Sequence, residues 1–253
     1  MKVAIISDLH SNRESLEAVF AHIRASGVTT IYCLGDVVGY GPEPEFCVDL
    51  VRGHAALCLM GNHDDALLND ASDFNPHART AIEYTRARMK PKWYSASEKK
   101  ARWDWLASLP LTHQEGRFMF VHGSPRDPVR EYVLSTDGIL NPDKLRAVFD
   151  SFTGIAVGGH THHPGVHEED LSFHGLGGRG ELTWPLEEGR KYFINVGSTG
   201  QPRDGDFRAC YAVLEDHQVT WYRVPYDYRI TQKKILDTGV LSEVLARRLS
   251  IGK

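Results

Sequence analysis

Cysteine is scarce in this chain, and its few copies are not spaced to bind a metal or to form a disulfide framework. Four cysteines occur among 253 residues, at Cys33, Cys47, Cys58 and Cys210, and no C-x-x-C pair is present. Cys33 and Cys58 fall within apolar runs, where a free thiol behaves as a small hydrophobic side chain. The pattern excludes a small disulfide-stabilised scaffold and favours a reducing, cytoplasmic location.

Long apolar runs and an excess of basic residues are also missing. No apolar stretch approaches the ~20 residues of a membrane helix, so no membrane partner is expected. The N-terminal apolar run meets Asp8 too early for a signal peptide. The net charge is −4 without a long basic run, so nucleic-acid binding is not favoured. The composition fits one domain over residues 1–253, as a monomer or a homodimer.

One stretch, residues 30–41, combines a buried-strand pattern with a polar end. Residues 30–34 are β-branched, aromatic or apolar, and Gly35-Asp36 follows them directly. A carboxylate at the C-terminal end of a buried strand lies where open α/β sheets place their ligands. A single Gly-Asp pair is also compatible with a simple turn cap.

The same order, an apolar run followed by metal-type ligands, occurs four more times. The polar residues that follow these runs are Asp8 and His10, Asn62 and His63, His122, and His160 and His162. Mixed nitrogen and oxygen ligands suit Mn, Fe or Zn, and no thiolate is spaced to join them. The recurrence favours a metal site over five unrelated turns.

The ordered motifs D-x-H, G-D, G-N-H-D, H-G and G-H-x-H, between residues 8 and 162, resemble the calcineurin-like metallophosphoesterase superfamily. The turns at 39–42 and 195–198 further resemble its small bacterial branch of YfcE-like phosphodiesterases and diadenosine-tetraphosphatase-related proteins. The resemblance implies a four-layer α/β/β/α sandwich of two mixed β-sheets flanked by helices. The order of strand and helix patterns along the chain suggests the same fold.

Three segments refine this expectation. Residues 65–110 are rich in Arg, Lys, Ala and aromatics, which predicts a small helical cap inserted beside the strand ends. From residue 166 onward the pattern alternates, and we expect antiparallel strands of the second sheet there. Residues 175–189 form a glycine-rich segment without an assigned element, and residues 228–250 are predicted to be helical.

The resemblance also implies a two-metal site and its mechanism. Asp36 would bridge the metals, with Asp8, His10 and His162 completing one site. Asn62, His122 and His160 would complete the other. Mn is the first expectation for the two ions, with Fe, Zn and Ni as alternatives. A metal-bridging hydroxide would attack phosphorus, and His63 would protonate the departing oxygen.

One departure from the family pattern concerns phosphate binding. In the protein-phosphatase branch an Asp and an Arg occupy the positions that are Gly39 and Tyr40 here. Asn12, Arg126 and Arg203 are therefore candidates for binding the substrate phosphate. Helix capping by Asn12 and surface ion pairs of the two arginines are equally compatible with the sequence.

The predicted function is hydrolysis of small phosphodiesters, nucleotides or dinucleoside polyphosphates at the two-metal site. A phosphomonoesterase or a protein phosphatase on the same site is an alternative within the enzyme class. A non-catalytic metal-binding scaffold is the alternative from another class. The complete set of ligand types, together with His63, favours an enzyme.

Overall fold

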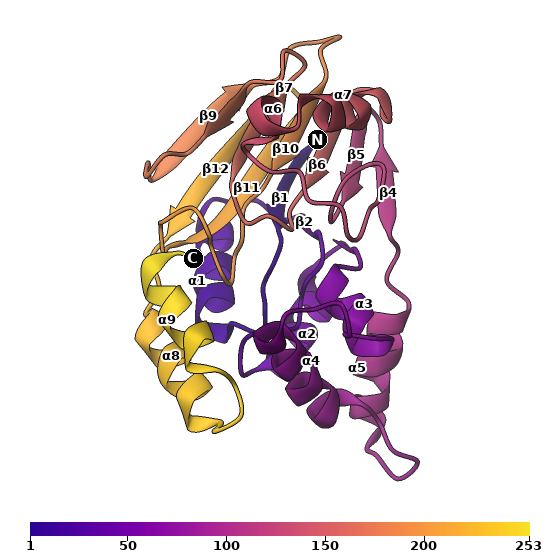
Figure 1. Ribbon diagram of the computed structural model, residues 1–253, viewed down its shortest axis with the longest axis vertical. Coiled ribbons are helices and arrows are strands. Elements are labelled where there is room, and N and C mark those ends of the chain that lie inside the picture. The colour runs from indigo at the N-terminus through magenta and orange to yellow at the C-terminus, as the bar shows by residue number, and fades with distance from the viewer.

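Two six-stranded sheets lie face to face between layers of helices in the computed structural model, which describes residues 1–253 (Figure 1). The first sheet has the order β3 (Leu57–Cys58), β2 (Ile31–Cys33), β1 (Lys2–Ile6), β11 (Ala209–Glu215), β12 (Gln218–Val224), β9 (Glu181–Pro185). β1, β2 and β3 are parallel, and the other three strands continue the sheet in antiparallel pairings.

The second sheet has a parallel centre as well. Its order is β4 (Thr112–Glu115), β5 (Phe118–Val121), β6 (Ile155–Gly158), β10 (Tyr192–Asn195), β7 (Gly165–Glu168), β8 (Phe173–Gly175). β5, β6 and β10 run parallel, while β4, β7 and β8 pair antiparallel at the two edges. Both sheets are therefore mixed, as predicted.

The prediction that the C-terminal strands build the second sheet is wrong for two of them, β11 and β12. β11 and β12 extend the first sheet from β1, and β9 joins them at the edge. β11 is buried along nearly its whole length, which suits a central strand between β1 and β12. Two edge strands, β4 and β9, had no sequence prediction, because β4 consists of polar residues only and β9 lies in the glycine-rich segment at 175–189.

Four of the helices begin at a residue whose side chain accepts a hydrogen bond from their first turn. The nine helices are α1 (Arg13–Ala25), α2 (Pro44–His54), α3 (Asn62–Leu68), α4 (Pro76–Met89), α5 (Ser97–Ala107), α6 (Asp137–Leu140), α7 (Pro142–Asp150), α8 (Tyr228–Asp237), α9 (Glu243–Ile251). Asn12 and Asn75 accept hydrogen bonds from backbone N–H groups in the first turns of α1 and α4. None of these helices has the length and apolar character that a bilayer crossing requires.

Two further helical predictions can be compared with the structure. Residues 65–110 are mostly helical, as predicted, because they contain the greater part of α3 and all of α4 and α5. The predicted helix at 228–250 is two helices. The chain turns between α8 and α9 at Gly239, whose positive φ of 63° favours glycine.

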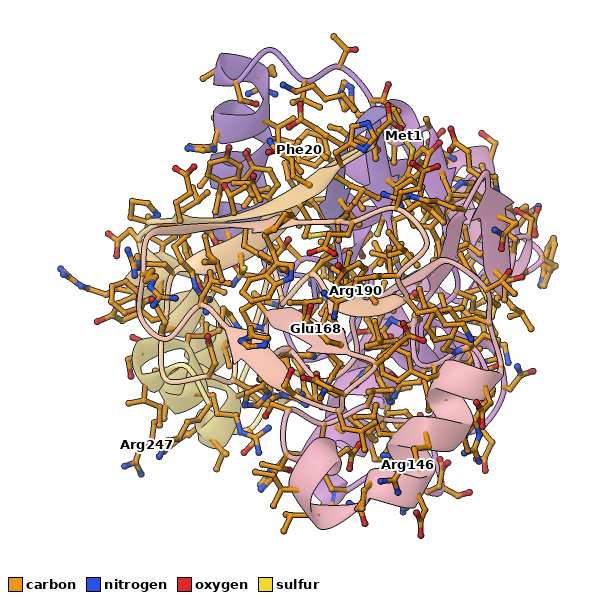
Figure 2. The ribbon with its side chains drawn as sticks, turned by 90° about the horizontal axis from the view of Figure 1, so that it is seen from above. Met1, Phe20, Arg146, Glu168, Arg190 and Arg247 are labelled. Carbon is orange, nitrogen blue, oxygen red and sulfur yellow. The ribbon has the colours of Figure 1, made fainter.

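Apolar side chains fill three interfaces between four layers. Ile5, Val157, Ile194 and Trp221 belong to the buried cluster between the sheets. α1 packs on the outer face of the first sheet and α7 on the outer face of the second. Seen from above, Phe20 of α1 and Arg146 of α7 lie on opposite sides of the molecule (Figure 2). The observed layers confirm the α/β/β/α sandwich.

The core between the sheets should carry much of the stability. Ile194 is fully buried there, whereas Ile139 is 85% exposed. We expect Ile194→Ala to lower the free energy of unfolding by about 2–5 kcal/mol, because it leaves a cavity. Ile139→Ala removes the same atoms from the surface and should change it by less than about 0.5 kcal/mol. Urea unfolding measures both, and equal losses would contradict this placement of the core.

Candidate metal centre

The predicted ligands converge where strands of both sheets end. Asp8 and His10 follow β1, Asp36 follows β2, and Asn62 opens α3 after β3. From the second sheet, His122 follows β5, and His160 and His162 follow β6. All seven side chains are buried, at 8% exposure or less. The site therefore spans the two sheets.

Most of these ligands have an unusual backbone conformation. Positive φ values of 48–65° occur at Asp8, His10, Asp36, His160 and His162. Residues other than glycine rarely adopt this region, and each costs of order 1–3 kcal/mol. Such residues concentrate at functional sites, so their clustering here indicates a constraint on side-chain direction rather than on the fold.

The first group of ligand atoms is Asp8 Oδ1 with two imidazole nitrogens. His162 Nε2 lies 3.1 Å from Asp8 Oδ1 and 3.2 Å from His10 Nε2. His10 Nε2 is also 3.8 Å from Asp36 Oδ2. These separations are close to the ~3 Å between adjacent ligands on a metal with bonds of about 2.0–2.1 Å.

The second group lies on the other side of Asp36. His122 Nε2 is 3.1 Å from both Asn62 Oδ1 and His160 Nδ1. It is also 3.5 Å from Asp36 Oδ2. The same carboxylate oxygen of Asp36 thus belongs to both groups, and the structure brings together every residue of the predicted ligand set.

Backbone carbonyls fix which imidazole nitrogens face the site. The carbonyl of Val38 lies 3.2 Å from His10 Nδ1, and that of Leu34 lies 2.9 Å from His122 Nδ1. His162 Nδ1 contacts the Gln201 carbonyl in the same way. A carbonyl can only accept, so each of these nitrogens carries the ring's proton. The opposite nitrogen, Nε2, then presents a lone pair.

His160 has the reverse orientation, with Nε2 3.1 Å from the Arg130 carbonyl, so that Nδ1 faces the site. The two groups therefore bring lone pairs together without protons between them. Asp8 Oδ1, which is buried, has no hydrogen-bond partner either. Lone pairs about 3.1 Å apart repel each other unless a cation lies between them. The residues present fit bound metal on this ground.

The pKa directions agree with a cation site. Burial lowers the pKa of His10, His122 and His160, and that of His162 to about 4, so the imidazoles are neutral ligands at pH 7. Burial, followed by the charge of Asp8, raises the pKa of Asp36 well above its usual range. A cation beside Asp36 would reverse this shift and favour the carboxylate.

Asp8 behaves differently. Burial alone would raise the pKa of Asp8, but the positive charge that the neighbouring histidines carry when protonated, led by His162, holds that pKa well below its usual range. Asp8 Oδ2 also accepts a hydrogen bond of 3.0 Å from the His160 backbone N–H. Both interactions favour the carboxylate form of Asp8, which is the form that a metal ligand needs.

The turn that carries Asp36 packs tightly on the start of α3. The backbone N–H of His63 donates a hydrogen bond to Asp36 Oδ1 at 2.8 Å. A Cβ atom at Gly61 would lie 2.1 Å from that oxygen, so only glycine fits there. Asp64 accepts hydrogen bonds from the backbone N–H groups of Val37, Val38 and Gly61. Sequence analysis gave Asp64 no such structural role.

A cleft of about 230 Å³ opens over the ligands. Its lining residues are Asp36, Tyr40, Asn62, His63, Asp73, Phe74, Asn75, Arg130, Tyr132, His160, His162 and Arg203. Tyr132 stacks on His160 with 3.8 Å between ring centroids. The sequence signal for Arg130 and Tyr132 was weak, since only their position in the loop after His122 pointed to the site.

Of the three residues predicted to bind substrate, the structure places only Arg203 in the cleft. Its guanidinium donates to Gln201 Oε1 at 3.1 Å and to the Tyr40 hydroxyl at 3.3 Å. No carboxylate lies within 4 Å of Arg203, in contrast to Arg130, which pairs with Asp65 and Asp73. Arg203 therefore offers a positive charge that no side chain neutralises.

Asn12 and Arg126 lie elsewhere. Asn12 caps α1 through Oδ1 and donates from Nδ2 to the Gly200 carbonyl at 2.8 Å, so both ends of its amide are engaged. Arg126 is 41% exposed in its side chain and lies 3.6 Å from Glu131 Oε1. These positions match the capping and surface-pair alternatives, and they give no support to substrate binding by either residue.

The comparisons with known proteins agree with this geometry. The sequence model of the calcineurin-like phosphoesterase superfamily domain matches residues 1–218. An uncharacterized protein of Methanocaldococcus jannaschii is 37% identical over 262 residues, covering 99% of this chain and 98% of that protein. The crystal structure of a metallophosphoesterase from Sphaerobacter thermophilus has a TM-score of 0.84 and 38% identity, covering 100% and 99% of the two chains.

A third relative covers less of the chain. The symmetrical bis(5′-nucleosyl)-tetraphosphatase of Aromatoleum aromaticum is 28% identical over 131 residues, which is 49% of this chain and 46% of that protein. The family match spans most of the chain and includes all the ligands described above. The chain therefore belongs to the calcineurin-like phosphoesterase superfamily and is a metallophosphoesterase, a hydrolase of phosphoric esters.

Proposed function

We propose that this metallophosphoesterase uses a binuclear metal centre to hydrolyse small phosphodiesters, nucleotides or dinucleoside polyphosphates. The observation that carries the proposal is the position of Asp36 Oδ2, which faces both His10 Nε2 and His122 Nε2. One oxygen between two ligand groups is the arrangement of a bridging carboxylate. Bound divalent ions supply Lewis-acid polarisation of phosphoryl oxygens and a lowered pKa of bound water.

The ligand chemistry favours certain metals. One group holds Asp8, His10 and His162, and the other holds Asn62, His122 and His160, with Asp36 common to both. Imidazole and oxygen ligands without a thiolate suit Mn first, with Fe, Zn and Ni as alternatives. The imidazoles are held rigidly before any metal binds, because the ring nitrogen of each that faces away from the site is hydrogen-bonded to the backbone.

Arg203 is the residue we assign to phosphate binding. It lines the cleft with a guanidinium that is paired only with neutral acceptors. Such a group can offer parallel N–H donors to two oxygens of one phosphoryl group. Arg203 thus takes the place of the family arginine that is absent at Tyr40.

His63 is assigned to the departing oxygen. Its Nδ1 is buried, so Nε2 is the nitrogen that can face a substrate in the cleft. Burial, followed by the charge of Arg203, lowers the pKa of His63 well below its usual range. A phosphate group bound beside the imidazole adds negative charge and raises that pKa again. Substrate binding would therefore prepare His63 to donate its proton.

The substrate class follows from size and from similarity. A cleft of about 230 Å³ lies below the usual range for drug-sized ligands, which favours a small phosphorylated group over a folded protein. The replacement of the protein-phosphatase Asp and Arg by Gly39 and Tyr40 points the same way. Similarity to a tetraphosphatase supports a nucleotide or dinucleoside polyphosphate. A metal-supplemented screen should compare these with simple monoesters, whose preference would indicate a phosphomonoesterase instead.

The shared ligand gives the first test of this proposal. Asp36→Asn should lower the bound metal from about two ions per chain and remove nearly all hydrolysis of bis-p-nitrophenyl phosphate, because a neutral amide bridges metals poorly. Elemental analysis and the hydrolysis assay measure the two effects. Asp143→Asn, at a side chain that is 97% exposed, is the matched control. Two ions and normal turnover in Asp36→Asn would refute the bridge, and metal-free, inactive wild-type protein would favour a scaffold.

Two arginines provide a matched test of phosphate binding. Arg203→Gln should lower kcat/KM by roughly 10- to 100-fold, because charge-assisted hydrogen bonds contribute about 1.5–3 kcal/mol. Arg126→Gln removes the same charge outside the cleft and should leave kcat/KM within about twofold. Steady-state kinetics on one phosphodiester with both variants decides the assignment. A larger loss for Arg126→Gln than for Arg203→Gln would reverse it.

The leaving group tests the role of His63. A p-nitrophenolate leaves readily as an anion, whereas an alkoxide such as a ribose oxygen needs a proton. His63→Gln should cost up to ~10²–10⁴-fold on alkyl esters and clearly less on p-nitrophenyl esters. Its metal content should stay at the wild-type value. Loss of metal in His63→Gln would indicate that His63 is a metal ligand. Equal losses of activity on both ester types would indicate that His63 only binds phosphate.

A further inference from the structure

We propose that Phe74, in the loop between α3 and α4, is a positioning residue that holds the His63 imidazole in line with the cleft. The inference rests on the proposed role of His63 as proton donor. It starts from an anomaly at that ring: Nδ1 of His63 is buried and has no hydrogen-bond partner. Catalytic histidines are usually held by a hydrogen bond at the nitrogen that faces away from the substrate.

No carboxylate can take up that function here. Gly39 has a φ of +96°, and a Cβ atom there would lie 2.4 Å from His63 Nδ1, so the ring packs directly on the glycine. Asp64 is occupied by three backbone N–H groups, and Asp65 pairs with Arg130 at 2.7 Å. The orientation of His63 must therefore come from packing.

Three aromatic rings surround His63. Tyr40 has its ring centroid 4.5 Å away, His10 4.8 Å, and Phe74 5.0 Å, the last in a T-shaped contact at 78°. His10 is a proposed metal ligand, and Tyr40 belongs to the turn after β2. Phe74 is the one contact that comes from the helical insertion, and edge-to-face packing of this kind restricts how the imidazole can rotate.

The loop that carries Phe74 is itself braced. Arg79, on α4, donates to the backbone carbonyls of Ala71, Ser72 and Phe74. Asp73 pairs with Arg130 across the cleft at 2.6 Å. The loop is thus tied to α4 through Arg79 and to the loop after β5 through Arg130. Phe74 can restrain His63 because its own backbone is fixed.

This arrangement gives the insertion at 65–110 a defined task. Trp93 is 89% exposed, and Trp103 packs against the core on the outer side of the first sheet. Neither lines the cleft, whereas Asp73, Phe74 and Asn75 do. We therefore assign the contribution of the insertion to Phe74 rather than to Trp93 or Trp103.

The test compares substrates with poor and good leaving groups. Phe74→Ala should lower kcat on an alkyl phosphodiester by about 2- to 10-fold more than on bis-p-nitrophenyl phosphate, because only the first needs the proton. Phe74→Tyr keeps the ring and should retain the wild-type ratio. Phe207→Ala, at a 37% exposed ring packed on Tyr228 outside the cleft, is the control and should leave the ratio unchanged.

A double variant separates positioning from structural support. In the His63→Gln background, Phe74→Ala should cost nothing further on the alkyl ester. Equal losses on both esters, or a loss that adds to that of His63→Gln, would overturn the inference while leaving the role of His63 intact. If His63→Gln itself shows no dependence on the leaving group, the proposed function of His63 fails, and the inference falls with it.

A readout without activity completes the design. In the metal-free chain labelled with ¹⁵N-histidine, the ring signals of His63, assigned by their loss in His63→Gln, should be those of one fixed environment. Phe74→Ala should broaden or shift them, and Phe207→Ala should not. Unchanged His63 signals in Phe74→Ala would overturn the inference, because the ring would then be held without Phe74.

Discussion

Repulsion among buried lone pairs at the strand ends is the central electrostatic constraint in this molecule. The ring N–H groups of four histidines, His10, His122, His160 and His162, each face a backbone carbonyl. Four unprotonated nitrogens therefore meet two carboxyl groups at the buried base of the cleft. Burial of unpaired ions costs several kcal/mol each. Bound cations would relieve this repulsion, so metal binding should stabilise the folded chain.

Backbone strain adds to the free-energy cost of this site. Five of the ligand residues have left-handed conformations that an ordinary turn would avoid. Two sheets are needed to enforce them. Leu9 and His10 donate their N–H groups to the Asp36 carbonyl, and Gly200 donates to the Asp8 carbonyl, so each strand-end loop is held by its neighbour. The packing of the two sheets therefore supplies the stability that holds this unfavourable cluster of side chains in place.

Sequence reasoning succeeded where function and local pattern coincide. Each ligand directly follows an apolar strand, so Asp8, Asp36 and His122 could be placed at strand ends without knowing which strands pair. Sheet membership could not be read this way. β11 and β12 look like strands of any antiparallel sheet. They join the first sheet because β11 pairs with β1, some 200 residues away in the chain, and β12 pairs with β11.

The same limit explains why the residues that line the cleft could not be predicted from the sequence. Arg203 and Arg126 lie in loops of similar composition, and only the fold decides that one faces the ligands and the other faces solvent. Asn12 satisfies both a capping and a binding pattern, and its amide is used by the cap. Phe74 had no sequence signal at all, because an aromatic before a helix start is ordinary.

The loss of the orienting carboxylate has a consequence for the electrostatics of His63. A carboxylate at Nδ1 would hold the ring and at the same time raise its pKa. Gly39 and Phe74 supply a contact without charge, so the pKa of His63 depends instead on burial, on Arg203 and on the bound phosphate. Orientation and protonation, which one carboxylate would control together, are then controlled separately. In the proposed scheme, packing from the helical insertion would set the orientation of His63, and the charge of the substrate would set its protonation.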